Sequence, residues 1–246
     1  MMKNPVKIIK LEEVDSTNNY ISSKLSHMDL PVCVTASFQT AGKGQGENIW
    51  HSVKAENLLF SYAFKPENLR PDESFYISRI ASIAITEFYS EYLPGVKIKW
   101  PNDILFRDRK LAGILLENRF FGNKVDVSIS GMGLNVNQEK FPGFSPEAGS
   151  IRSLTGKSIN LEHALDSVLE KLEFWIDILN RHDLSSIARE YNRKLYRFME
   201  TALYKSENEF FEAKISGVEE DGHLILLTTS GETRKYAFKE VEFIFS

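Results

Sequence analysis

Four short stretches of the chain carry more glycine, lysine and amide side chains than the packing of a core requires. Polar segments of this kind are where ligands and reacting groups are held, because a rigid scaffold presents functional side chains on its loops and strand ends. In chain order the stretches are Asp15-Ser-Thr-Asn18, Gln39-Thr-Ala-Gly-Lys-Gly-Gln45 running on to Trp50, Lys99-Trp-Pro-Asn-Asp103 followed by Lys110-Leu-Ala-Gly113, and Gly131-Met-Gly-Leu-Asn135.

The second stretch is a glycine-dense loop with a cation in its middle. Glycines let backbone N–H groups approach a ligand, and Lys43 between Gly42 and Gly44 adds positive charge, a combination that suits phosphate. The loop is not a Walker motif, because no Ser or Thr follows Gly-Lys, and no amphipathic helix opens after it as in a dinucleotide fingerprint. A flexible connector fits the same residues equally well. Trp50 could stack on a purine, or it could be an ordinary core residue.

The third stretch places two cations, an amide and a carboxylate around neighbouring strand ends. Lys110 opens an apolar strand, so its ammonium group is expected at the mouth of a site rather than in the core. The alternative is an exposed set of salt bridges on a hairpin, formed by Lys99, Asp103 and Lys110 and worth little to stability. Gly113 inside the strand indicates either a ligand that approaches the backbone closely or a β-bulge.

The first and fourth stretches have simple structural explanations as well. Asp15 or Ser16 is a good helix N-cap, and this interpretation is favoured when the residues are taken alone. The segment Gly131-Met-Gly133 at the end of a strand has the same two interpretations as Gly113.

The elements that must position these residues follow from the spacing of apolar side chains. Period-2 and continuous apolar runs predict strands, and positions repeating at i, i+3 and i+4 predict helices. Pro31 and Pro94-Gly95 end two of the helices, and Asn160 caps the longest. The expected strands are 8–11, 32–38, 58–64, 96–100, 104–106, 110–116 and 125–131, and the expected helices are 16–28, 74–92, 161–179 and 184–197.

After Glu200 the sequence changes to short β runs. Asp221-Gly222 and Ser230-Gly231 are hairpin signals between them. About 45 residues of β structure predict a small barrel that needs docking to the main body. We therefore expect a main domain in residues 1–199 and a small β-barrel domain in residues 200–246.

Composition excludes several classes of function. The 246 residues include 30 Lys and Arg against 34 Asp and Glu, a formal net charge of −4, which lacks the basic footprint of non-specific nucleic-acid binding and of anionic-membrane binding. The first ten residues hold no apolar signal region, and no apolar run reaches membrane-spanning length. Cys33 is alone, so no internal disulfide forms, and a soluble protein of the cytoplasm is expected, with Cys33 as a buried structural thiol. The five histidines are scattered, so no protein-held metal site is expected.

The four stretches, in this order, resemble the biotin protein ligases. That family shows Ser-Thr-Asn at the start of its catalytic domain, a Gly-Arg-Gly-Arg type of loop ending in Trp, a Lys-Trp-Pro-Asn-Asp block with Lys-Leu-Ala-Gly-Ile-Leu downstream, and Gly-x-Gly-x-Asn. The match runs from Asp15 to Asn135. The resemblance implies an α+β fold with a class II-synthetase-like mixed sheet, flanking helices and a small C-terminal SH3-like β-barrel. It also implies that the chain activates biotin with ATP to biotinyl-5′-AMP and passes biotin to a lysine of a biotin carrier domain of acetyl-CoA carboxylase or a related carboxylase, with Mg²⁺ carried in by ATP.

The resemblance assigns a role to each matching residue. Lys110, Lys43 and Asp103 are the catalytic residues, with Lys110 stabilising charge on the carboxylate and α-phosphate and Asp103 orienting the incoming amine. The biotin-binding residues are Ser16, Thr17, Asn18, Gln39, Gly42, Lys43, Gly44, Gln45, Lys110 and Gly113. The nucleotide-binding residues are Lys43, Trp50, Lys99, Asn102, Lys110 and Asn135.

The glycine loop departs from the family pattern. Lys43 stands for the first arginine and Gln45 for the second, and Glu47 falls where a glycine is common. Either the lower charge weakens retention of the adenylate, or Gln45 and Asn48 rebuild the hydrogen bonds of the loop and close it equally well. Asp15 lies too near the N-terminus for an upstream DNA-binding domain, so the short, non-repressor form is expected. The alternatives are a lipoate or octanoate ligase of the same fold and a non-catalytic biotin sensor. A homodimer through an exposed sheet edge is compatible with the sequence but not required by it.

Overall fold

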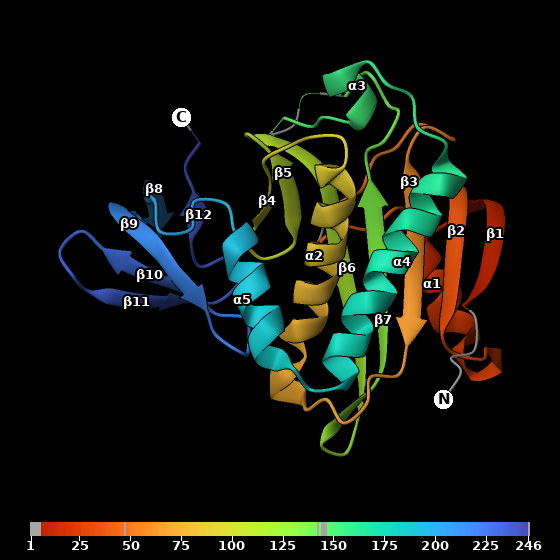
Figure 1. Cartoon of the computed structure of the whole chain (residues 1–246), viewed down its shortest axis with the longest axis horizontal. Helices are drawn as coiled ribbons and strands as arrows, with labels where there is room; N and C mark the ends of the chain where they lie inside the picture. The colour runs from red at the N-terminus through yellow and green to blue at the C-terminus, as the bar shows by residue number, and fades with distance from the viewer. Residues whose placement is uncertain (1–5, 47, 142, 144–146, 246) are drawn as a thin grey trace.

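The computed structural model describes residues 6–46, 48–141, 143 and 147–245. A seven-stranded mixed sheet runs through the larger part of the molecule in the order β1-β2-β3-β7-β6-β5-β4 (Figure 1). Strand β1 pairs with β2 in parallel, and all other neighbours in this sheet are antiparallel. The strands are β1 (Lys7–Val14), β2 (Val32–Gln39), β3 (Leu58–Phe64), β4 (Val96–Lys99), β5 (Asp103–Phe106), β6 (Arg109–Phe121) and β7 (Lys124–Leu134).

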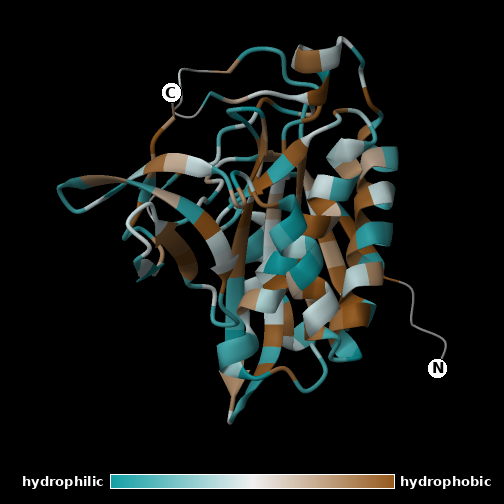
Figure 2. Cartoon of the chain, turned by 60° about the vertical axis from the view of Figure 1, so that its left-hand side comes forward, coloured by the Kyte–Doolittle hydropathy of each residue, from teal (hydrophilic) through white to brown (hydrophobic). Residues whose placement is uncertain are grey.

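The two faces of this sheet are covered differently. Helices α2 (Phe75–Ser90), α4 (Leu161–Asn180) and α5 (Leu184–Lys194) pack on one face, and their apolar stripes form the main core with Cys33 and Tyr62 (Figure 1). Figure 2 shows hydrophilic and hydrophobic bands alternating along the helices on this face, and α2 is buried along nearly its whole length. Since side chains alternate along a strand, the residues between those of the main core point to the other face. There α1 (Thr17–Lys24) covers a second, smaller cluster through Ile21.

The expected strands and helices of this part are present, but several of their bounds are wrong; for example, β1 continues to Val14 and β6 to Phe121. The first helix ends at Lys24 and continues as a 3₁₀ turn, η1 (Leu25–His27), so its expected stripe is not one continuous α-helix. Strand β7 continues past Gly131 to Leu134, because β3 and β6 pair with it on both sides along that length. Helix α5 ends at Lys194, where Leu195 turns to extended backbone and bridges to Ile98.

The two expected helix caps differ in the structure. Asn160 accepts hydrogen bonds from the backbone N–H groups of Glu162 and His163, as a capping side chain does. Ser16 occupies the N-cap position of α1, but its side chain makes no capping bond. The Ser16 hydroxyl group is therefore not used to hold the helix.

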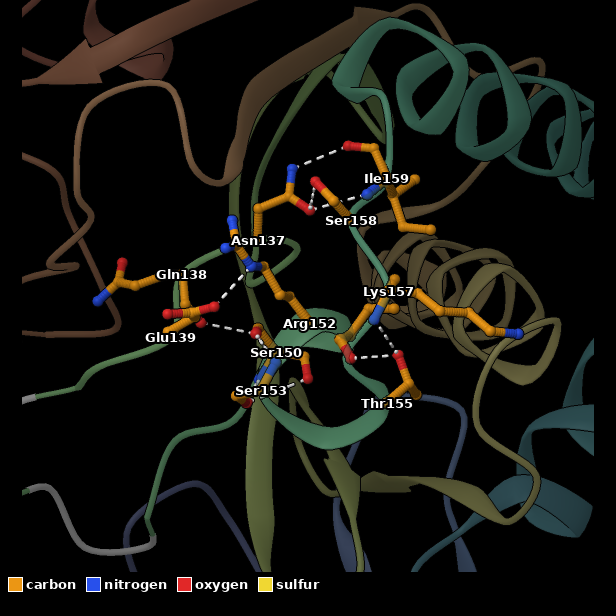
Figure 3. A network of polar contacts seen from close by, with 11 residues as sticks. Asn137, Gln138, Glu139, Ser150, Arg152, Ser153, Thr155, Lys157, Ser158 and Ile159 are labelled. Atoms are coloured by element: carbon orange, nitrogen blue, oxygen red, sulfur yellow. Dashed lines mark hydrogen bonds and ion pairs between the residues drawn. The ribbon is translucent and has the colours of Figure 1, made fainter.

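The chain beyond β7 is fastened by a polar network around the short helix α3 (Ile151–Thr155) (Figure 3). The Ser150 hydroxyl donates to the Gln138 carbonyl at 2.6 Å, and Asn137 exchanges two hydrogen bonds with the backbone of Ile159. Just before this network, Glu147 O accepts from the backbone N–H of Lys110 at 2.7 Å. The network therefore supports the start of β6 from outside the sheet.

The C-terminal residues form a separate antiparallel sheet of five strands in the order β11-β10-β9-β8-β12. Both expected hairpins are confirmed, between β9 and β10 and between β10 and β11. The strands are β8 (Thr201–Ser206), β9 (Glu209–Val218), β10 (Leu224–Thr228), β11 (Thr233–Tyr236) and β12 (Glu242–Phe243). The remaining short helix, η2 (Pro71–Glu73), precedes α2.

Candidate active site

A cavity of about 140 Å³ opens beside α1, on the face of the large sheet opposite α2 and α4. Residues from all four polar stretches line it, although they are up to 117 positions apart in the chain. The lining residues are Ser16, Thr17, Asn18, Gln39, Lys43, Gly44, Gln45, Asn48, Ile49, Trp50, Phe60, Asn102, Asp103, Lys110, Gly113, Ile114, Leu115, Gly131, Met132 and Gly133.

Two glycines on neighbouring strands make the floor of the cavity. Gly113 of β6 and Gly133 of β7 are direct cross-strand partners, and the Trp50 indole lies against both. A Cβ atom on Gly133 would lie 2.4 Å from Trp50 Cε2, and one on Gly113 would lie 3.0 Å from Trp50 Cζ3. Both glycines therefore allow the Trp50 indole to approach the backbone closely, which was one of the two interpretations open for each of them.

A β-bulge directs Lys110 into the cavity. The register between β5 and β6 shifts at Ile104 and Leu105, so that Leu111 is the extra residue in the pairing. Because side chains alternate along a regular strand, Lys110 and Gly113 would point to opposite faces without the bulge. With it, Lys110 Cε lies 3.5 Å from the position of a Cβ on Gly113. The Tyr89 hydroxyl, buried under the bulge, donates to Leu111 O at 2.8 Å.

Lys110 forms the principal ion pair of the site with Asp103. Lys110 Nζ lies 2.6 Å from Asp103 Oδ1, and the two side chains are 30% and 16% exposed. Lys110 Nζ also lies 5.7 Å from the centre of the Trp50 ring. Asn102, beside Asp103, is held by a hydrogen bond from its Nδ2 to Ile114 O at 2.7 Å. The pair thus stands at the edge of the cavity, where it is partly protected from solvent.

The other end of the cavity is a buried polar cluster. The backbone N–H and the hydroxyl of Thr17 both donate to Gln39 Oε1, at 2.7 and 3.1 Å. The Asn18 side chain donates through Nδ2 to Glu117 Oε2 at 3.1 Å. Ser16, Thr17 and Asn18 are all at least 96% buried, so this end of the cavity can bind the polar groups of a ligand out of contact with bulk water.

The glycine loop forms one wall and closes on itself. Gly42 and Gly44 exchange backbone hydrogen bonds with Trp50 and Asn48, at 2.9 and 2.7 Å. Lys43 Nζ donates to Asn19 Oδ1 at 2.7 Å, on the exposed side of the loop. Gln45 lines the cavity, whereas Glu47 lies outside the described residues.

Three of the expected site residues do not line the cavity. Gly42 is buried in the loop, with its carbonyl bonded to Trp50. Asn135 is buried at the end of β7 and donates to Lys110 O at 3.3 Å, so it holds the lysine backbone. Lys99 Nζ lies 5.0 Å from the centre of the Phe243 ring in the C-terminal sheet, and burial lowers the pKa of Lys99 against the opposing effect of Asp103.

Sequence reasoning missed two residues that lie directly behind the polar end. They are Ser61 of β3 and Glu117 of β6, which contact Thr17 and Asn18. The sequence did offer one indication for Ser61. It is a small polar residue inside the apolar strand Leu-Leu-Phe-Ser-Tyr-Ala-Phe, every residue of which is buried. Glu117 had no comparable signal.

The remaining expectations concern metal, membrane and thiol. Within the described residues, no cluster of three or more His, Cys, Asp or Glu side chains could hold a metal ion. None of the helices in the described part of the chain has the length and apolarity to cross a membrane. Cys33 is fully buried, and burial raises the pKa of its thiol to about 12, which confirms a structural thiol.

The fold and the cavity define an α+β domain in which a mixed sheet carries a polar cavity with a cation–carboxylate pair at its edge. A family model described as the biotin/lipoate A/B protein ligase family matches residues 11–135, about half of the chain and all four polar stretches. The chain belongs to this family.

Individual relatives agree with this assignment. The chain is 26% identical to the bifunctional ligase/repressor BirA of Bacillus subtilis over 92% of its own length and 71% of that protein. It is 25% identical to the biotin–[acetyl-CoA-carboxylase] ligase of Paracoccus denitrificans, over 90% and 94% of the two chains. It also superimposes on the biotin protein ligase from Aquifex aeolicus, solved in complex with biotin and ATP, with a TM-score of 0.78, 25% identity and coverage of 98% and 99%.

Proposed function

We propose that this chain is a biotin–[acetyl-CoA-carboxylase] ligase, which activates biotin with ATP to biotinyl-5′-AMP and transfers biotin to a lysine of a carrier domain. One observation carries the proposal: a single cavity joins a buried polar end at Thr17 and Asn18 to a cation–carboxylate pair at Lys110 and Asp103. A ligand with a polar head and a reactive carboxylate fits such a cavity, with its head in the buried end and its carboxylate at the lysine.

The proposed roles follow from the position of each group. The Lys110 ammonium stabilises negative charge as the biotin carboxylate attacks the α-phosphate, and a fixed charge is most effective in a partly desolvated site. Asp103 then orients the amine of the carrier lysine, since it lies at the same edge of the cavity. Gln39, Thr17 and Asn18 bind the urea ring, whose buried N–H and C=O groups need partners.

The nucleotide side of the site is proposed from the same contacts. Trp50 offers an aromatic face for the adenine, and the glycine loop offers backbone N–H groups and Lys43 for the phosphates. Lys99 and Asn135 support the reacting residues from behind the cavity and act on the nucleotide through them. Mg²⁺ enters with ATP, held by the phosphates, because Asp103 is the one carboxylate among the described residues that line the cavity and is already paired with Lys110.

The proposal is tested with the purified chain, Mg-ATP and a biotin carrier domain. We expect biotin-dependent release of pyrophosphate and biotin on one carrier lysine, detected by intact mass. Lipoate and octanoate, offered separately, test the alternative ligases of this fold. Pyrophosphate release with lipoate or octanoate but not with biotin would contradict the proposal, and biotin binding without pyrophosphate release would indicate a non-catalytic sensor.

A further inference from the structure

A chain of buried hydrogen bonds runs behind the polar end of the cavity. Ser61 Oγ lies 2.6 Å from Thr17 Oγ1 and 2.6 Å from Asn18 Oδ1, and Ser61 itself is fully buried. Glu117 Oε2 accepts from Asn18 Nδ2 at 3.1 Å. Neither Ser61 nor Glu117 lines the cavity, so both act on a ligand only through Thr17 and Asn18.

Glu117 and Ser61 together fix the orientation of the Asn18 amide. An ionised carboxylate only accepts hydrogen bonds, so it requires the NH₂ group of Asn18 to face it. The Asn18 carbonyl oxygen is then directed to the Ser61 hydroxyl, which donates to it. Gly131 provides the space, because a Cβ there would lie 2.4 Å from Asn18 Oδ1. A rotated amide would set a carbonyl oxygen against the carboxylate.

The cluster holds more acceptors than protons. Three contacts between oxygen atoms join Gln39 to Thr17, Thr17 to Ser61, and Ser61 to Asn18. They share only two hydroxyl protons, those of Thr17 and Ser61, because the two amide oxygens carry none. One contact therefore lacks a proton at any moment, and a ligand that supplies N–H donors relieves the deficit.

This deficit distinguishes the two head groups that the family offers. A cyclic urea carries two N–H donors for the spare lone pairs of this oxygen-rich cluster, whereas the dithiolane ring of a lipoyl group carries none and would leave these lone pairs unused. A site built to hydrogen-bond a ligand rejects an analogue that lacks the matching group far better than an apolar pocket rejects an extra one.

We propose that Ser61 and Glu117 are positioning residues that set the hydrogen bonding of Thr17 and Asn18 and thereby select a cyclic urea over a dithiolane. The inference rests on the proposed biotin ligase function and identifies the residues that make the site selective.

The first test compares Ser61→Ala with Ser128→Ala. Ser128 of β7 is also fully buried, but its hydroxyl has no hydrogen-bond partner within the described structure, so it is a matched control. We expect Ser61→Ala to raise the KM for biotin about ten- to hundredfold, as loss of a buried hydrogen bond does, with the KM for ATP unchanged. Desthiobiotin, which keeps the cyclic urea, should lose affinity in parallel, while weak lipoate binding measured by calorimetry stays the same. Ser128→Ala should leave all of these values unchanged.

The second test uses Glu117, which is only half-buried and tolerates substitution. Glu117→Gln keeps an oxygen that can accept from Asn18, and should keep the KM for biotin within about threefold of the parent. Glu117→Leu removes the acceptor at similar volume and should raise that KM about tenfold or more. Rescue by glutamine would not follow from a purely structural role.

The outcomes separate the two proposals. If the parent chain forms no biotinyl-5′-AMP, the proposed function itself fails. If the parent is active but Ser61→Ala behaves like Ser128→Ala, the positioning role is wrong and the function stands. The same conclusion follows if Ser61→Ala and Glu117→Leu raise the KM values for biotin and ATP together.

Discussion

The direction and the charge of the Lys110 side chain are set by residues around it. Its direction comes from the bulge at Leu111, its backbone is held by Glu147 and Asn135, and its ammonium is paired with Asp103 at 2.6 Å. The preceding residue of the same strand, Arg109, pairs with Glu147 in an exposed salt bridge. Lys110 therefore carries a positive charge that is fixed in the cavity, whereas Arg109 carries an ordinary surface charge.

Substitution of Lys110 by alanine should lower the rate of adenylation about 100-fold or more, the usual cost of one preorganised charge in an active site. Stability should change by less than about 1 kcal/mol, because the pair is partly exposed. Pyrophosphate release and urea denaturation measure the two effects, and Arg109→Ala is the control for a lost cation on the same strand. Near-normal turnover in folded Lys110→Ala would show that Lys110 forms only a salt bridge with Asp103 and is not catalytic.

Cys33 gives a pH dependence whose sign is fixed by burial. Its pKa is raised from 9.0 to about 12 in the folded state, so above pH 9 the unfolded chain releases a proton that the folded chain keeps. The thiol's contribution to stability is therefore complete below pH 9 and falls between pH 9 and 12, by up to ~1.4 kcal/mol per pH unit. Urea denaturation at pH 8, 9 and 10 should show the stability difference between the parent and Cys33→Ala becoming smaller as pH rises. A difference that does not depend on pH would contradict the assignment.

At the scale of elements, strands β6 and β7 carry the floor of the site. Gly113 and Gly133 lie on one rung and Gly131 lies two rungs away, and each of these glycines leaves space that a side chain of the site occupies. Trp50 takes the space over the first two, and Asn18 takes the space over the third. The site therefore needs glycine at these three positions as much as it needs the side chains around them.

Gly133→Ala should displace the Trp50 indole, because the new Cβ would lie 2.4 Å from Trp50 Cε2. We expect a rise of about tenfold or more in the KM for ATP and a change in tryptophan fluorescence. Gly217→Ala in β9 is the matched control, since nothing lies within 4 Å of its Cβ position. Equal effects of the two substitutions would show that the indole does not depend on the glycine floor.

The elements also show what the sequence can and cannot predict. Strand β3 was predicted with its bounds, because seven consecutive apolar or small residues leave little choice, and Asn160 was recognised as a cap from its type. A β-bulge was one of two interpretations of Gly113, but its position at Leu111 and its effect on Lys110 were not predicted, because they depend on pairing between β5 and β6 and not on local sequence. Ser61 and Glu117 were missed for a similar reason: they meet Asn18 from strands 43 and 99 residues away.

At the scale of the whole molecule, the turn between β9 and β10 holds the small C-terminal sheet to the large one by buried hydrogen bonds, beside aromatic contacts such as that of Trp100 with Phe238. Arg79 of α2 is buried and donates to the carbonyl oxygens of Val218 and Glu219, and Trp100 Nε1 donates to Gly222 O at 2.8 Å. We propose a domain boundary near residue 200, between α5 and β8. The Trp of the Lys-Trp-Pro-Asn-Asp block then serves to join the domains, while Asp103 of the same block serves the cavity.

Trp100→Phe should loosen this attachment by removing one buried hydrogen bond while keeping most of the aromatic packing on Phe238, 5.2 Å away. Hydrogen exchange followed by mass spectrometry should show faster exchange in β9 and β10, with β2 and β3 unchanged. Trp175→Phe is the control, because its Nε1 donates to Glu87 at 3.0 Å, away from the C-terminal sheet. Unchanged exchange in β9 and β10 of Trp100→Phe would show that Arg79 alone holds the turn.

The resting place of the Trp50 indole has a consequence for how fast a ligand can enter. The space it leaves, about 140 Å³, is below the ~300 Å³ at which ligand pockets begin, so we expect the indole to move aside before a whole ligand binds. The observed association rate should then level off as ligand concentration rises, at the rate of opening. The measured affinity is also lower than that of the open form, in proportion to the fraction of time the indole is away. A variant whose indole spends longer off the glycines, with no side chain added to the floor as in Gly133→Ala, would bind its ligand more tightly without gaining a single contact to it.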